Sequence, residues 1–209
     1  MLLSDQQYQS IINILKGKEK KSEFFCAFEK WFQQTFQLKM YGYICDETHD
    51  GRKRLKIVLW NHESQKKMKD GINWDISKQK DILQCFLTLS QKYHLYPDYD
   101  HCIISYDTLE DEIKKRILQK IKPQLDTIHR PYIWKIEVIF DQVHVFFKTD
   151  EQIRACQQTG ICDEMNQKIL DFIKPIDDLN VFDQNFSCVF TSRQTLNEKY
   201  NGSLFNYTR

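Results

Sequence analysis

The chain has 209 residues, and its 30 Lys and Arg side chains nearly balance 29 Asp and Glu side chains, which leaves a formal net charge of +1 at pH 7. A charge this small gives no global attraction to nucleic acid or to an anionic membrane. Hydrophobic residues make up 41% and charged residues 28%, as in folded globular proteins, and no segment approaches the run of about 18 apolar residues that a membrane helix needs. We expect no membrane association. The N-terminus lacks the basic and apolar regions of a signal peptide, so we also expect a cytoplasmic protein.

The first 36 residues predict two helices. Ser4 and Gln7 have the spacing of a capping box, and apolar side chains recur at helical spacing up to Leu15. A charged run over 17–21 then ends this helix. From Ser22 onward aromatic side chains recur with a helical period, which predicts a helix with one buried face. These aromatic residues are Phe24, Phe25, Phe28, Trp31, Phe32 and Phe36.

A β-hairpin is expected after the aromatic helix. Two β-rich runs, 40–45 and 55–60, flank a loop that contains the strong turn signal Asp50-Gly51. Alternate residues of the second run are large and aliphatic, so we expect that face of the strand to point into a core. These residues are Leu55, Ile57 and Leu59.

Three further segments complete the first half. A helical stretch is expected from residue 63, broken near Gly71, and a longer helix over 75–93 carries one apolar stripe. Residues 102–106 have the composition of a strand.

The second half predicts a similar order of elements. Thr108 and Asp111 can cap a helix that reaches Leu125, and Thr149 and Gln152 have the spacing of a second capping box. Between them, strands are expected over 134–140 and 143–148. The remaining expected elements are a helix that breaks at Gly160 and resumes over 163–173, a strand over 188–191, a helix over 194–200, and a terminal turn and edge strand over 201–207.

Segments of the two halves also match residue by residue. Leu55 to Leu59 lies over Val143 to Phe147, and Cys102 to Ser105 lies over Cys188 to Thr191. The offsets of the matched segments stay within 86 to 88 residues, a constancy that random matches rarely show. We interpret the chain as an internal duplication.

The expected fold class is therefore α+β, with two tandem pseudo-symmetric helix-hairpin-helix-strand units and mixed sheets. The first unit spans 1–107, with an extra N-terminal helix and a longer hairpin loop, and the second spans 108–209. No linker rich in Pro, Gly or Ser separates them, so we expect the units to pack closely together.

No local group of residues predicts a catalytic residue, a cofactor or a metal ion. The seven cysteines lack a Cys-x-x-Cys pair, and the six glycines are too dispersed for a phosphate-binding loop. The densest polar run, Cys45 to Asp50, is typical of a turn, and His101 and Cys102 are adjacent on a strand and so point to opposite faces. Each group is better explained as structural, and whether the chain is an enzyme stays open.

We favour a non-catalytic protein-binding module, with an inhibitor or immunity-type protein as the concrete version. Tyr and Trp are enriched at protein interfaces, and the segment around residues 93–100 combines tyrosines with acidic residues in a loop-like sequence. The expected contact residues, taken to be exposed, are Trp60, Tyr93, Tyr96, Asp98, Tyr99 and Asp100.

Two alternative hypotheses stay open. Basic residues gather in the first half of the chain, which is typical of a groove for RNA or single-stranded DNA; the residues concerned are Arg52, Lys53, Arg54, Lys66 and Lys67. The other alternative is an enzyme whose active site lies between the two units and combines residues that are distant in the sequence.

Overall fold

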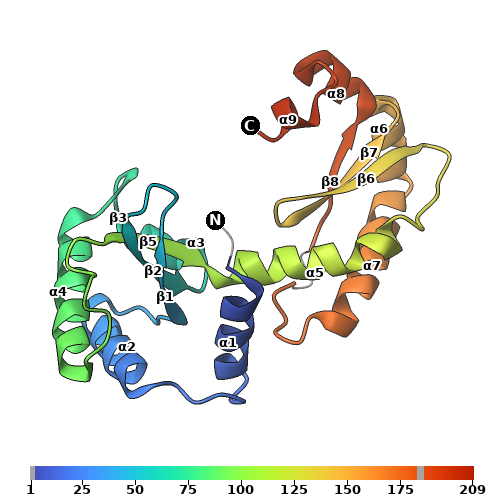
Figure 1. Cartoon of the computed structure of the whole chain (residues 1–209). Coiled ribbons are helices and arrows are strands. Elements are labelled where there is room, and N and C mark those ends of the chain that lie inside the picture. The colour runs from blue at the N-terminus through green and yellow to red at the C-terminus, as the bar shows by residue number, and fades with distance from the viewer. Residues whose placement is uncertain (1–2, 183–185) are drawn as a thin grey trace. The chain divides into compact units, whose positions relative to one another are not determined.

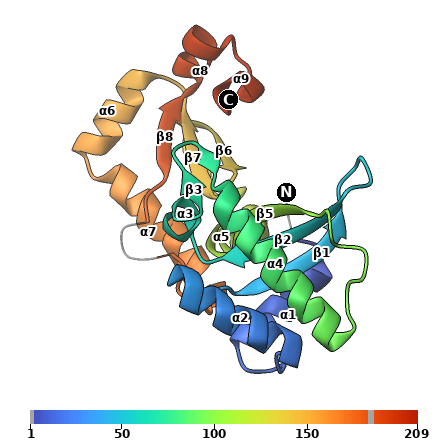
Figure 2. The same ribbon diagram turned by 90° about the vertical axis from the view of Figure 1, so that its left-hand side faces the viewer.

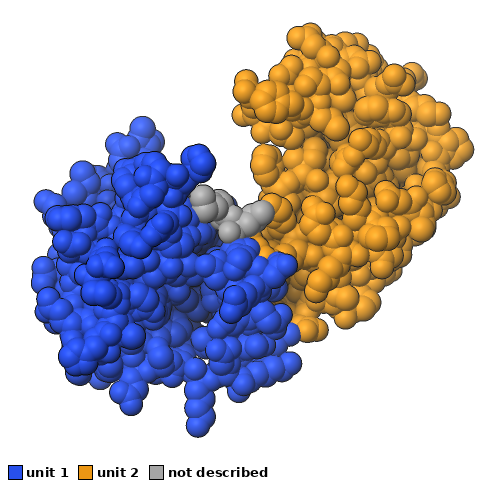
Figure 3. All heavy atoms as spheres, in the orientation of Figure 1, with its two compact units in different colours: residues 1–110 blue, residues 111–209 orange. Residues whose placement is uncertain are grey.

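The structure, a computed structural model, describes residues 3–182 and 186–209. In this part of the chain, nine α-helices accompany eight β-strands that form three small sheets, which confirms the α+β class. The chain divides into two compact units, residues 1–110 and 111–209 (Figure 3). The boundary falls within the first turn of helix α5 (Leu109–Leu125).

Unit 1 is built on a three-stranded mixed sheet. Its elements are α1 (Asp5–Leu15), α2 (Glu23–Phe36), β1 (Gly42–Glu47), β2 (Lys53–Leu59), α3 (His62–Lys66), β3 (Lys69–Asp70), β4 (Asn73–Trp74), α4 (Ile76–Tyr93) and β5 (Ile103–Thr108) (Figure 1). The strand order is β1-β2-β5, with β1 antiparallel and β5 parallel to β2. Parallel neighbours cannot be joined by a tight turn, so the chain from β2 to β5 crosses over through α3 and α4.

The core of unit 1 lies between the sheet and the helices α2 and α4, which cover the same face (Figure 2). The aromatic helix is confirmed, and Phe28 and Phe32 are fully buried. Phe28 packs against Phe86 of α4 with ring centroids 5.7 Å apart. Leu55, Ile57 and Leu59 also point into this core, as their alternation predicts.

The opposite face of the same sheet is buried as well, which the alternation along β2 did not predict. Arg54 is 8% exposed, and Lys56, expected to face away from the core, is only 2% exposed. Helix α1 lies against this second face, where a Cβ built on Gly42 would approach Ile11 Cδ1 to 2.9 Å. Only glycine lets the helix and the strand come this close.

Unit 2 is built on a second mixed sheet with the order β6-β7-β8. Its elements after α5 are β6 (Ile133–Ile139), β7 (Gln142–Phe147), α6 (Asp150–Gln158), α7 (Ile161–Ile173), the 3-10 helix η1 (Lys174–Ile176), β8 (Val189–Ser192), α8 (Arg193–Tyr200) and α9 (Leu204–Tyr207) (Figure 1). β6 pairs antiparallel with β7, and β8 pairs parallel with it. The capping box at the start of α6 is confirmed.

Two local expectations are wrong. The stretch after residue 63 is only the single turn of α3, followed by the small hairpin of β3 and β4 around Gly71, whose φ is +61°. Residues 204–207 form the helix α9 and not an edge strand, because the Ser203 side chain caps it by accepting from the Asn206 N–H. The Tyr207 hydroxyl of α9 is hydrogen-bonded to His144 Nδ1 at 2.8 Å, and the Tyr207 ring packs on the face of β7 that carries His144.

Candidate functional site

Strand β1 is one of the two outer strands of the unit 1 sheet, and a groove of about 430 Å³ runs beside it. We call this the β1 groove. One side is formed by α1 and by the connection between α1 and α2, and the other by residues Gly42 to Cys45 of β1. Phe25 and Tyr96 add aromatic rings to its lining.

Alternate residues of β1 direct their backbone N–H and C=O groups away from β2, the one strand that pairs with β1 among the described residues. The Thr48 N–H donates to the Arg52 carbonyl at 2.9 Å, in register with the ladder between β1 and β2. Backbone groups alternate in direction along an antiparallel strand, so even-numbered residues bond to β2. Tyr43, Cys45 and Glu47 therefore direct their N–H and C=O groups toward the free edge. Such an edge is a template for pairing with another strand.

Two tyrosines that line the β1 groove also pack against the core. The Tyr43 and Tyr96 hydroxyls are hydrogen-bonded at 3.1 Å, and both rings pack against Phe24. Burial raises the pKa of Tyr43, and it raises the pKa of Tyr96 as well. Both phenols are therefore protonated at neutral pH, and a neutral hydroxyl can both donate and accept.

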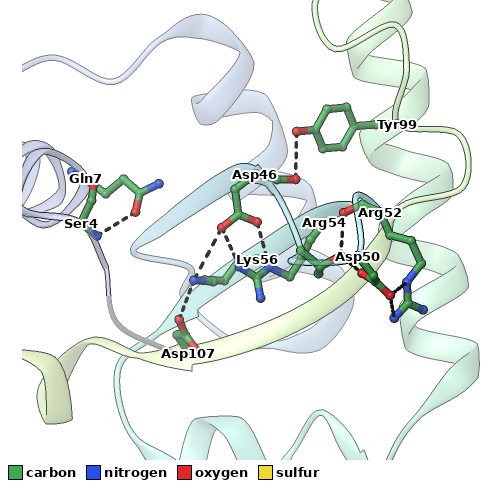
Figure 4. Close-up of polar contacts among 10 residues, drawn as sticks. Ser4, Gln7, Asp46, Asp50, Arg52, Arg54, Lys56, Tyr99 and Asp107 are labelled. Atoms are coloured by element: carbon green, nitrogen blue, oxygen red, sulfur yellow. Dashed lines mark hydrogen bonds and ion pairs between the residues drawn. The ribbon is translucent and has the colours of Figure 1, made fainter.

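The structure brings one of the expected protein-contact residues, Tyr96, into the β1 groove. Tyr93 is half-buried against Phe24, with ring centroids 5.9 Å apart. Tyr99 is 8% exposed within the core, so its expected exposure is wrong. The reason is that the loop after α4 folds back over the end of the sheet, where the Tyr99 hydroxyl lies 3.5 Å from the Asp46 carbonyl (Figure 4).

The other expected contact residues lie apart from the β1 groove. Asp98 and Asp100 are exposed on the loop, and Asp100 lies 3.4 Å from the imidazole of His101. Trp60 follows β2 and packs on Tyr41, with ring centroids 5.2 Å apart. No single surface is therefore formed by the six expected residues together.

The basic residues of the first hairpin, which carry the nucleic-acid hypothesis, are paired with carboxylates. Arg52 binds Asp50 at 2.7 Å, and Arg54 binds both carboxylate oxygens of Asp46 at 2.8 and 2.7 Å (Figure 4). Lys53 binds Glu47. Each positive charge is balanced locally and contributes little to a field that would attract phosphates.

The remaining basic residues of that hypothesis are exposed. Lys66 binds Glu63 at 2.6 Å, and the Lys67 carbonyl accepts from the Lys78 ammonium at 2.8 Å. The charge of Lys66 is therefore balanced by a carboxylate, whereas the contact of Lys67 involves only its backbone carbonyl.

Lys56 is the centre of a buried charge group on the second face of the sheet. Its ammonium lies 3.1 Å from Asp107 and 4.0 Å from Asp46, which also holds Arg54 (Figure 4). Two cations face two carboxylates, so the group is neutral overall. We assign it a structural role.

Two thiols of unit 1, the half-buried Cys45 and the buried Cys102, are poor candidates for nucleophiles. Burial raises the pKa of Cys45 to about 12, and it raises the pKa of Cys102 to about 11. Thiols with such values stay protonated at neutral pH. His101 is 94% exposed and Cys102 is buried, but the expectation that both lie on a strand is wrong, because β5 begins only at Ile103.

A second groove, of about 560 Å³, lies beside β6, one of the two outer strands of the unit 2 sheet. Its lining is residues 133–137 of β6 and the segment from Lys122 to Pro131, at the end of α5. We call it the β6 groove. Sequence reasoning did not single it out; the available signal is the Lys135-Ile136-Glu137 tripeptide, since charged residues are typical of strands at a sheet edge.

Comparison of this chain with protein-family models, with curated proteins and with solved structures finds no match. Across residues 3–182 and 186–209, no helix has the length and apolar character needed to cross a membrane. In the same ranges, His, Cys, Asp and Glu side chains nowhere form a group of three or more that could hold a metal ion.

Proposed function

We propose that this chain is a protein-binding module that holds an extended segment of a partner protein in the β1 groove. The observation that carries the proposal is the free edge of β1, which opens onto a groove long enough to be lined by four consecutive strand residues. An extended segment can add to such an edge through backbone hydrogen bonds, while pockets beside the edge select its side chains.

The lining of the β1 groove indicates what this segment contains. Ile11, Ile14 and the ring of Phe25 are apolar, and the two charges, Glu19 and Lys20, have opposite signs. Glu19 also accepts from the Ser10 hydroxyl at 3.2 Å. A segment with apolar side chains at alternate positions and no strong net charge fits this lining.

We also propose that the two units are an internal duplication. Both sheets consist of an antiparallel hairpin followed by a strand parallel to its second member. Leu59 pairs with Thr108 where β2 and β5 end, and Phe147 pairs with Ser192 where β7 and β8 end. Phe147 lies 88 residues after Leu59, but Ser192 lies 84 residues after Thr108. When β5 and β8 are aligned by their ends, the offset is therefore 84 residues, two fewer than the 86 residues between Cys102 and Cys188.

The test uses peptides selected from a random library displayed on phage, with the full chain as bait. Synthetic copies of the selected peptides are then titrated against the chain by fluorescence polarisation. The Ser10→Arg variant places a long side chain in the β1 groove, and Gln9→Arg adds the same charge to α1 at an exposed position outside the lining.

We expect Ser10→Arg to weaken the binding of the peptides by about tenfold or more, because the Arg side chain fills the groove and the peptide loses its apolar contacts there. Gln9→Arg should bind them as the natural chain does. A library that yields no binding peptide, or peptides that bind equally to the Ser10→Arg variant, would refute the proposal.

A further inference from the structure

Strand β6 has an outer edge and a charge pattern that is complementary to itself. It is one of the two outer strands of the unit 2 sheet, and its residues 133–137 line the β6 groove. Lys135 and Glu137 lie on either side of Ile136, and apolar residues follow on both sides, Trp134 and Val138. Read from either end, this strand is apolar, charged, apolar, charged, apolar, with charges of opposite sign.

The hairpin determines which residues of β6 have free backbone groups. Ile139 pairs with Gln142 across the two-residue loop Phe140-Asp141. The pair that closes such a loop is hydrogen-bonded, and bonding alternates along the ladder. Glu137 and Lys135 therefore bond to β7, while Ile136 and Val138 direct their N–H and C=O groups to the open edge.

A second β6 strand fits this edge in one antiparallel register. With Ile136 opposite Ile136 of the second copy, outward-directed residues face each other and can form backbone hydrogen bonds. Lys135 then lies opposite Glu137 of the second copy, and Glu137 opposite its Lys135. These are the pairs without backbone bonds, in which side chains approach most closely, and opposite charges there are stabilising.

Neighbouring registers are disfavoured by charge. A shift by two residues keeps the backbone bonds but places Lys135 opposite Lys135 in one direction, or Glu137 opposite Glu137 in the other. Like charges directly opposite each other are destabilising. A shift by one residue brings inward-directed backbone groups to the edge, so it loses the hydrogen bonds.

We propose that β6 of two copies pairs antiparallel about a two-fold axis at Ile136, which joins their unit 2 sheets into one six-stranded sheet. Such an interface is isologous, because the same strand serves both copies. The ion pair between Lys135 and Glu137 within one chain, 2.5 Å long, becomes part of a four-charge group of alternating sign. This inference does not depend on the function proposed for the β1 groove.

The test is the mass of the protein in solution, measured by sedimentation velocity at increasing protein concentration. The natural chain should form a dimer. Glu137→Lys places Lys opposite Lys, and Lys135→Glu places Glu opposite Glu, so each variant should dimerise about tenfold more weakly or worse.

Two further samples separate loss of charge complementarity from loss of folding. Mixing the Glu137→Lys and Lys135→Glu chains restores opposite charges at both positions, and the mixture should dimerise. The double variant that exchanges both residues should dimerise alone. A monomeric natural chain, single variants that dimerise as it does, or a mixture that stays monomeric would each overturn the proposal.

Discussion

Replacing Lys56 by Met tests whether the buried charge group stabilises unit 1. Met fills nearly the same space as Lys but carries no charge. Without the Lys56 ammonium, which lies 3.1 Å from Asp107, the Asp107 side chain has lost its cation and is 23% exposed, while Asp46 is still paired with Arg54. Removing one partner of a buried ion pair costs about 3–5 kcal/mol. The Asp107 carboxylate stays in partial contact with water and Asp46 stays paired, so the cost should be smaller than this. We expect a loss of about 2–3 kcal/mol in the free energy of unfolding.

The assay is urea denaturation followed by circular dichroism, with two comparisons. Lys53→Met removes an exposed ion pair with Glu47 and should destabilise the chain much less than Lys56→Met, because water and salt screen exposed charges. Lys56→Met combined with Asp107→Leu removes both partners and should recover most of the loss, because no unpaired charge is left buried. If Lys56→Met is no more destabilising than Lys53→Met, the assignment of a structural role is wrong.

Two further predictions concern single positions. Gly42→Ala should lower the free energy of unfolding by about 1–3 kcal/mol, because its Cβ would lie 2.9 Å from Ile11 Cδ1. In a chain that already carries Ile11→Ala, the same change should cost much less in the same denaturation assay. An equal cost of Gly42→Ala with and without the Ile11 change would contradict the close packing. Burial lowers the pKa of His144 below its ordinary 6.5, although Asp141 opposes the shift. The unfolded chain then binds a proton more readily than the folded one, so His144 favours folding above about pH 6.5 and this stability is lost as the pH falls through the folded value. The unfolding free energy should therefore fall less between pH 7 and 5 in His144→Gln than in the natural chain, and identical pH profiles would refute this.

Much of the secondary structure could be predicted because it follows from local periods. Side-chain spacing predicts the aromatic helix α2 and the capping box at Ser4, and β-rich runs on either side of the Asp50-Gly51 turn predict the first hairpin. The burial of Lys56 could not be predicted, because its partner Asp107 lies at the end of β5, distant in sequence. The β3 and β4 strands are two residues long each, too short to show a period.

The candidate site was only partly predictable. Tyr96 was chosen for its residue type, and the structure places it in the β1 groove, but its place there depends on the chain reversing after α4. A free edge is a property of strand order, which the order of strands along the chain does not reveal. Tyr99 shows the limit of composition most clearly, because a tyrosine suited to an interface is also suited to a core.

Strand addition at β1 can be tested most directly by amide hydrogen exchange, resolved by residue with NMR, with and without a peptide selected on the natural chain. We expect the N–H groups of Tyr43, Cys45 and Glu47 to become protected when the peptide binds, since they gain acceptors. The N–H groups of Ile44 and Asp46, already bonded to β2, should change much less. A bound peptide that leaves the exchange of Tyr43, Cys45 and Glu47 unchanged would contradict the account.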